Sequence, residues 1–224
     1  MRVITSRSGL CQSMRPCPIC SNGERRELES GYAGRDVNLY SCSACGFRYV
    51  DADYLDQAWL DSYYKTFYTT DDKQYSYDRY ESLAIYLKSI TNDVLDIGGL
   101  DGELGEHCAG QGIAYEAIGV GDAPRDKYDC VVVSHTLEHI YDIHTFMQRV
   151  KSALVSGGWL VVEVPHFRQY AGVKGYDYHW QHINKFRTRD LMALFRDNGF
   201  SVEYSQSAGH YREYQCWRIS GKMN

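Results

Sequence analysis

The stretch DVLDIGGLDGELGEHCAGQG, residues 93–112, is the part of the sequence that indicates the fold. Its apolar run Val94–Ile97 is typical of a buried strand, the glycines after it predict a turn, and the remaining residues are compatible with a helix. In such a strand–turn–helix unit, glycines allow a nucleotide-like ligand to touch the backbone near the start of the helix. The pattern argues against a phosphate-binding P-loop, because no Lys-Ser or Lys-Thr pair follows the glycines.

Strands and helices continue to alternate after this unit. The run VVVSH, which ends at His135, reads as a strand reaching its carboxyl end. Residues 142–165 read as a helix, a turn at Gly157-Gly158 and a buried strand, and Thr188 and Gly199 are suited to cap and to close a further helix. This alternation predicts an open α/β sheet, in which ligands bind beyond the carboxyl ends of the strands.

The glycine turn resembles the first motif of class I S-adenosylmethionine-dependent methyltransferases, Asp/Glu-x-Gly-x-Gly-x-Gly. Three of the four fixed positions match, at Asp96, Gly98 and Gly102, and Leu100 replaces the middle glycine. The resemblance implies a Rossmann-like sheet and S-adenosylmethionine as the cofactor. It also implies a set of cofactor-binding residues in and after the turn, with one of the last two near the ribose: Asp96, Gly98, Gly99, Asp101, Gly102, and Glu116 or Asp122.

Two CxxC pairs near the amino terminus predict a metal site. Cys17-Pro-Ile-Cys20 and Cys42-Ser-Ala-Cys45 each aim two thiolates at one point, and together they would form the tetrahedral sulfur shell that zinc prefers. Four protein ligands leave no open coordination position, so the expected role is structural. Residues 11–50 are therefore predicted to form a small zinc ribbon, with Cys11 as a competing ligand and four unligated thiols as the alternative.

Within the methyltransferases, the chain is similar to the zinc-containing sugar C-methyltransferases. Asp101-Gly102 matches the end of their glycine turn, and residues 178–186 resemble their Glu-His-x-x-x-Phe segment, with Gln181 in place of the glutamate. The resemblance implies a ribbon at 11–50, a tyrosine-rich connection and helix at 51–90, and a methyltransferase-like domain at 91–224. It also implies a nucleotide-linked sugar or glycan precursor as the acceptor, with Tyr176, Tyr178 and Trp180 offering flat faces to a sugar ring.

Three histidines are candidates for the chemistry. His182 is the first choice for the base, since a neutral imidazole accepts a proton around neutrality. His135 and His139 are expected at the mouth of the cofactor site, either in catalysis or as hydrogen-bonded structural residues. Residues 135–139 also match the inverted zinc-protease pattern HxxEH, but no long helix precedes them to present both histidines.

The middle of the domain is too short for a complete methyltransferase sheet. Only residues 113–127 separate the first helix from the strand at YDCVVV, where a second strand, a helix, a third strand and another helix would be needed. If the second strand ran to Asp122, the five residues left would reach only about 17 Å, whereas a strand ending near Ile118 leaves nine, which reach about 30 Å. The third strand and its helices are therefore predicted to be absent or vestigial. This opens the alternative of a non-catalytic binding or scaffold protein on a reduced methyltransferase fold.

The length and net charge of the chain limit the classes of protein to which it can belong. The 224 residues fit one α/β domain, or a smaller domain with a separately stabilised appendage. A net charge of −5 argues against a nucleic-acid partner, although a zinc-ribbon RNA methyltransferase remains an alternative. No apolar window approaches the roughly 18 residues that span a bilayer, and the opening MRVITSRSGL lacks a secretory apolar core. We therefore expect a cytoplasmic protein, in which CxxC pairs favour metal over disulfides.

Overall fold

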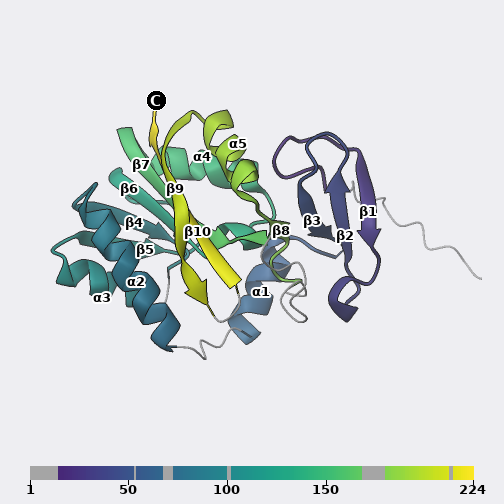
Figure 1. The fold of residues 1–224 in the computed structure, drawn as a ribbon, viewed down its shortest axis with the longest axis horizontal. Coiled ribbons are helices and arrows are strands. Elements are labelled where there is room, and N and C mark those ends of the chain that lie inside the picture. Colours follow the sequence, from purple (N-terminus) through teal and green to yellow (C-terminus); the bar gives the residue numbers. More distant parts are fainter. Residues whose placement is uncertain (1–14, 53, 68–72, 100–101, 168–179, 212–213) are drawn as a thin grey trace, which may run out of the picture.

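The computed structural model describes residues 15–52, 54–67, 73–99, 102–167, 180–211 and 214–224 (Figure 1). The elements in chain order are β1 (Arg25–Glu29), β2 (Asn38–Cys42), β3 (Arg48–Asp51), α1 (Gln57–Phe67), α2 (Lys73–Lys88), β4 (Asp93–Ile97), α3 (Glu103–Gly110), β5 (Ala114–Ile118), β6 (Tyr128–Ser134), α4 (Ile143–Ala153), β7 (Leu154–Pro165), β8 (Asn184–Lys185), α5 (Thr188–Asp197), β9 (Phe200–Tyr211) and β10 (Tyr214–Met223).

The larger sheet has the strand order β5-β4-β6-β7-β10-β9. The first four of these strands are parallel, and β10 runs antiparallel to both β7 and β9. From β4 the chain passes through α3 to β5 on one side and then returns to β6 on the other side of β4. The carboxyl end of β4 is thus the point where the strand order reverses, which is where open α/β sheets bind ligands. The predicted Rossmann-like sheet is confirmed.

Two helical layers cover this sheet (Figure 1). Because successive side chains of a strand point to opposite faces, Val94 packs with α2 and α3, whereas its neighbour Leu95 packs in the core that holds α4 and α5. The same alternation runs through β6 from Cys130 to Val133. Buried aliphatic side chains on both faces are typical of a parallel sheet between helices.

The prediction of a shortened middle section is confirmed. β5 ends at Ile118 and β6 begins at Tyr128, and the nine residues between them contain neither a helix nor a strand. This connection is fastened to α4 and the start of β7, since Arg149 donates to the carbonyl of Val120 and Lys127 Nζ donates to the carbonyls of Ser152 and Leu154 at 3.3 and 3.2 Å. A segment of turns and bends therefore takes the place of the third strand and its helices.

The cap predicted for α5 is wrong. Thr188 is the first residue inside the helix, and the residue before it, Arg187, is the cap. The carboxylate of Asp190 accepts a hydrogen bond from the Arg187 backbone N–H at 3.0 Å, which satisfies a donor left open at the helix start. Gly199 has a φ of +82° just after the helix, as a closing glycine should.

The smaller sheet has the order β1-β2-β3-β8. Its fourth strand comes from far along the chain, since β8 pairs antiparallel with β3 through Arg48–Lys185 and Tyr49–Asn184. Phe47 and Tyr49 are fully buried in the same apolar cluster as the sheet residue Leu95. The amino-terminal segment therefore shares a core with the larger sheet. Among the described helices, none has both the length and the apolar character required to cross a bilayer.

Candidate functional site

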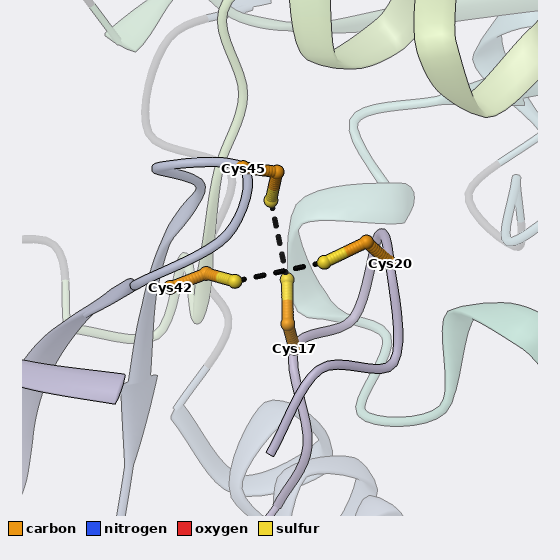
Figure 2. A group of neighbouring side chains, drawn as sticks. All are labelled: Cys17, Cys20, Cys42 and Cys45. Atoms are coloured by element: carbon orange, nitrogen blue, oxygen red, sulfur yellow. Dashed lines mark hydrogen bonds between the residues drawn. The ribbon is translucent and has the colours of Figure 1, made fainter. Parts of the chain in front are cut away.

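The four cysteines of the CxxC pairs converge on one point (Figure 2). The Sγ atoms of Cys17 and Cys45 lie 3.6 Å apart, as do those of Cys20 and Cys42. Sulfurs about 2.3 Å from a tetrahedral zinc ion are about 3.8 Å apart, so the spacing fits zinc and is far too long for a disulfide. Cys11 lies outside the described residues.

In the turn after β4, the first two glycines, Gly98 and Gly99, pack tightly against neighbouring side chains. Gly98 has a φ of +104°, and a Cβ there would lie 2.3 Å from Thr136 Oγ1. A Cβ at Gly99 would lie 2.0 Å from Asp96 Oδ2. Both positions therefore require glycine for the fold itself. Asp96 is buried at 2% exposure and accepts a 2.9 Å hydrogen bond from the hydroxyl of Tyr115, so it holds the base of the turn.

The far end of the same turn is open. Gly102 precedes α3 with a φ of +75°, and apart from its chain neighbours no heavy atom of the described residues lies within 4 Å of the position that a Cβ would occupy. Asp101 and Leu100 lie outside the described residues. Space beside the first N–H groups of a helix is suited to a polar ligand group.

The two acids expected near the ribose occupy different positions. Glu116 lies in the middle of β5 and accepts a 2.6 Å hydrogen bond from the hydroxyl of Tyr128, at the start of β6. Asp122 lies beyond the carboxyl end of β5, where its Oδ2 accepts a 2.9 Å hydrogen bond from the backbone N–H of Gly119. Only Asp122 is at the edge of the sheet where the glycine turn lies.

The three candidate histidines lie around one carboxylate, Glu138. His135 Nδ1 is 3.7 Å and His139 Nε2 is 3.8 Å from Glu138 Oε1. The ring centroids of His139 and His182 are 4.9 Å apart in an edge-to-face arrangement. His135 has a φ of +50°, which is uncommon for a residue with a side chain. Chemically the cluster can accept a proton or bind a cation.

Glu138 is the site residue that the sequence reasoning missed. It stood within the segment that matched the protease pattern, but it was not considered in its own right. Its side chain is 2% exposed, and within the described part of the chain neither carboxylate oxygen accepts a hydrogen bond. Burial raises the pKa of Glu138 to about 8. Burial also lowers the pKa of His135 well below its ordinary range, with the nearby charge of Arg79 acting in the same direction.

The loop that carries Glu138 is held by a buried arginine from the amino-terminal segment. Arg15 donates hydrogen bonds to the carbonyls of Ile140 and Tyr141 at 3.2 and 2.7 Å, to that of Val50 at 3.3 Å, and to Asn184 Oδ1 at 2.9 Å. Burial lowers the pKa of Arg15 to about 10, so it stays protonated at neutral pH. Because Arg15 is two residues before Cys17, the cysteine cluster and the histidine loop are linked directly.

Asn184 of β8 completes this attachment. Its Nδ2 donates to the carbonyls of Leu137 and Ile140 at 3.1 and 2.7 Å. Nearby, His139 Nδ1 lies 3.0 Å from the carbonyl of Gln181, and because a carbonyl only accepts, Nδ1 is the protonated nitrogen. The turn Leu137–His139 is thus pinned to the segment that carries His182.

Replacing Asn184 by alanine is expected to destabilise the protein. Two buried carbonyls and Arg15 would each lose one of their partners, and a buried hydrogen bond contributes about 0.5–1.5 kcal/mol net. We therefore expect the free energy of unfolding to fall by about 2–4 kcal/mol, measured by urea denaturation. As the control, Asn22→Ala removes an exposed turn amide and should change stability by well under 1 kcal/mol. Equal stability in the two variants would contradict the stabilising role of the Asn184 hydrogen bonds.

One aromatic residue does not have the predicted role. Trp180 is only 6% exposed, and its ring packs 5.4 Å from that of Trp59 in α1. It therefore belongs to the core, and the expectation that it faces a sugar ring is wrong. Tyr176 and Tyr178 lie outside the described residues.

A sequence model of the family described as a methyltransferase domain matches residues 78–205, more than half of the chain. No curated protein sequence matches. Solved structures that resemble the fold include the 1,6-didemethyltoxoflavin-N1-methyltransferase of Burkholderia thailandensis (TM-score 0.61, 14% identity, covering 90% of this chain and 99% of that one). Others are an S-adenosylmethionine-dependent methyltransferase of Aquifex aeolicus (0.54, 12%, 76% and 100%) and the magnesium protoporphyrin IX methyltransferase of Synechocystis (0.50, 14%, 77% and 97%).

Proposed function

Because the chain belongs to the methyltransferase-domain family, we propose that it transfers a methyl group from S-adenosylmethionine to a small acceptor. The observation that carries this proposal is the contact between the two parts of the site. Gly98, in the turn after β4, packs against Thr136, which lies between His135 and Glu138 in the loop after β6. A cofactor on the glycine turn and an acceptor over the histidines would then be neighbours.

The residues present fit the cofactor. The amino-acid end of S-adenosylmethionine would lie along the turn from Gly98 to Gly102, with its charged groups near the first N–H groups of α3. Asp122 is the better candidate for the ribose hydroxyls, since Glu116 already binds Tyr128. S-adenosylmethionine supplies an already activated methyl group when bound, so the chain has to align the acceptor and take up its proton.

We propose that the histidine cluster takes up this proton, with His182 as the first candidate and His135 and His139 beside it. The acceptor we expect is a carbohydrate, either a nucleotide-linked sugar or a glycan precursor. The similarity to sugar C-methyltransferases supports this choice, as does the link between a zinc-binding ribbon and the site. The zinc on Cys17, Cys20, Cys42 and Cys45 would be structural, because four thiolates leave no position for a substrate.

The alternative is a binding protein that uses the fold without the cofactor. The short connection between β5 and β6 favours it, because the missing strand and helices would normally wall the cofactor site. A calorimetric titration with S-adenosylhomocysteine separates the two proposals. Methyl transfer requires saturable binding at about one molecule per chain, and the absence of heat at high ligand concentration would favour the binding protein.

Gly102→Val is expected to abolish binding of S-adenosylhomocysteine, because the side chain would enter the open space beside α3. Gly98→Val is a poorer test, since its side chain would collide with Thr136 and damage the fold as well. The matched control is Gly157→Val, at a glycine with nearly the same φ of +74° and the same open surroundings, but near the start of β7. Calorimetry should show unchanged affinity in the control. Equal affinity in both variants would place the cofactor elsewhere.

A further inference from the structure

We infer that Glu138, His139 and His182 form a second metal site, for a divalent transition-metal ion, separate from the four cysteines. One potential ligand atom from each of the three side chains lies within 4.8 Å of the other two. Glu138 and His139 belong to one loop and His182 to another, so the group is assembled by the fold and is not a sequence motif.

The carboxylate is the strongest reason for a cation. Glu138 is 2% exposed, and neither of its oxygens accepts a hydrogen bond within the described residues. The imidazole nitrogens of His135 and His139 lie 3.7 and 3.8 Å from its Oε1, which is beyond hydrogen-bonding distance. A buried carboxyl group left in this way is costly, and a bound cation would satisfy it. Ligand atoms about 2.1 Å from such an ion are about 3.0–3.4 Å apart. Glu138 Oε1 and His139 Nε2, which are 3.8 Å apart, would therefore have to approach by roughly half an ångström, and no pair in the group is more than 4.8 Å apart.

The orientation of His139 supports the same conclusion. Its Nδ1–H donates to the carbonyl of Gln181 at 3.0 Å, which leaves Nε2, the nitrogen that faces Glu138, as the one with the lone pair. Metal-binding histidines nearly always donate their other N–H to a carbonyl or carboxylate in this way. Arg15 and Asn184 hold the loop by its backbone carbonyls, so the ligands are fixed before an ion binds.

The ligand set indicates the kind of ion. Two imidazoles and one carboxylate suit Zn²⁺, Fe²⁺ or Co²⁺ better than Mg²⁺ or Ca²⁺, which prefer oxygen ligands. Three protein ligands also leave coordination positions open. If the proposed function is correct, an acceptor oxygen would occupy one of these positions, which favours an acceptor rich in hydroxyl or keto oxygens. While an ion is bound, His182 is a ligand and cannot also be the base.

Cobalt is the probe. Protein with zinc in the four-cysteine site is dialysed against Co²⁺, and both metals are counted by mass spectrometry. We expect about one cobalt per chain in addition to one zinc. Glu138→Gln, which keeps the size of the side chain, and His182→Ala should each reduce the cobalt to near zero and leave the zinc unchanged. His144→Ala removes an exposed histidine outside the cluster and should bind cobalt normally.

Several outcomes would overturn the inference. No cobalt in the unaltered protein would do so, and so would as much cobalt in Glu138→Gln and in His182→Ala as in the unaltered protein, which would indicate exposed histidines as the ligands. Absorption by cobalt–thiolate bonds would show that cobalt has replaced zinc in the four-cysteine site. Cobalt found only there would also overturn the inference. If Glu138→Gln does not fold, His182→Ala carries the test. Calorimetry with S-adenosylhomocysteine is independent of these results, so methyl transfer and metal binding can fail separately.

Discussion

Cys20→Ser is expected to abolish zinc binding and to release the histidine loop together with the amino-terminal sheet. Cys20 is the exposed member of the cluster, so serine there disturbs packing little and acts through the lost thiolate. Structural zinc contributes about 10–16 kcal/mol of apparent binding free energy in zinc-finger peptides, and in such segments binding and folding are coupled. Without the metal, Arg15 loses its anchor at Cys17, so the carbonyls of Ile140 and Tyr141 each lose the hydrogen bond that Arg15 donates.

Hydrogen exchange measured by mass spectrometry checks this prediction, together with the zinc content. Peptides covering residues 15–51 and 135–141 should both exchange faster in Cys20→Ser, whereas those from α3 should not change. The control is Ser43→Ala, an exposed position in the second CxxC turn, which should keep about one zinc per chain. Faster exchange in 15–51 alone would show that the histidine loop does not depend on the ribbon.

His182→Ala is expected to retain its affinity for S-adenosylhomocysteine and to lose turnover by a factor of about 10²–10⁴, the usual contribution of general acid–base catalysis. The imidazole lies beside His139, with the ring centroids 4.9 Å apart, in the cluster that we propose faces the acceptor. A loss is expected whether His182 takes up a proton or holds an ion, and the cobalt count separates these two roles.

The measurement is the initial rate with a confirmed acceptor, with calorimetry for the cofactor. His144→Ala, on the exposed surface of α4, is the control and should keep both rate and affinity. Undiminished turnover in His182→Ala would move the role to His135 or His139, or leave alignment of the acceptor as the main source of rate.

The sequence predicted those features that depend on local pattern and spacing. The alternation of apolar strands and helices predicted the Rossmann-like sheet. The short connection of nine residues after Ile118 predicted that the third strand is absent. Cysteine spacing indicated the four-sulfur cluster. The histidines were expected at the carboxyl ends of the strands because the strand ending at Ser134 could be recognised from its valines.

The features that were missed depend on contacts between distant segments. Glu138 matters to the site because it is buried with no hydrogen-bond donor among the described residues, and a Leu-Glu-His tripeptide does not show this. Arg15 was not considered, since its acceptor Asn184 is 169 residues away. Trp180 was assigned to a ligand surface because it is an aromatic residue just before His182, whereas its burial follows from packing against α1.

The pairing of β3 with β8 has a consequence for folding during synthesis. β3 ends at Asp51 and β8 at Lys185, so the ribosome must add 134 residues before the smaller sheet can gain its last strand. At about 5–20 residues per second, that interval lasts roughly 7–27 s. During this time the side chains of Phe47 and Tyr49 lack their buried environment, and an early supply of metal would hold the two cysteine turns together while the rest of the chain emerges. Zinc bound at this stage would therefore limit the disorder of the amino-terminal segment while the nascent chain waits for its last strand.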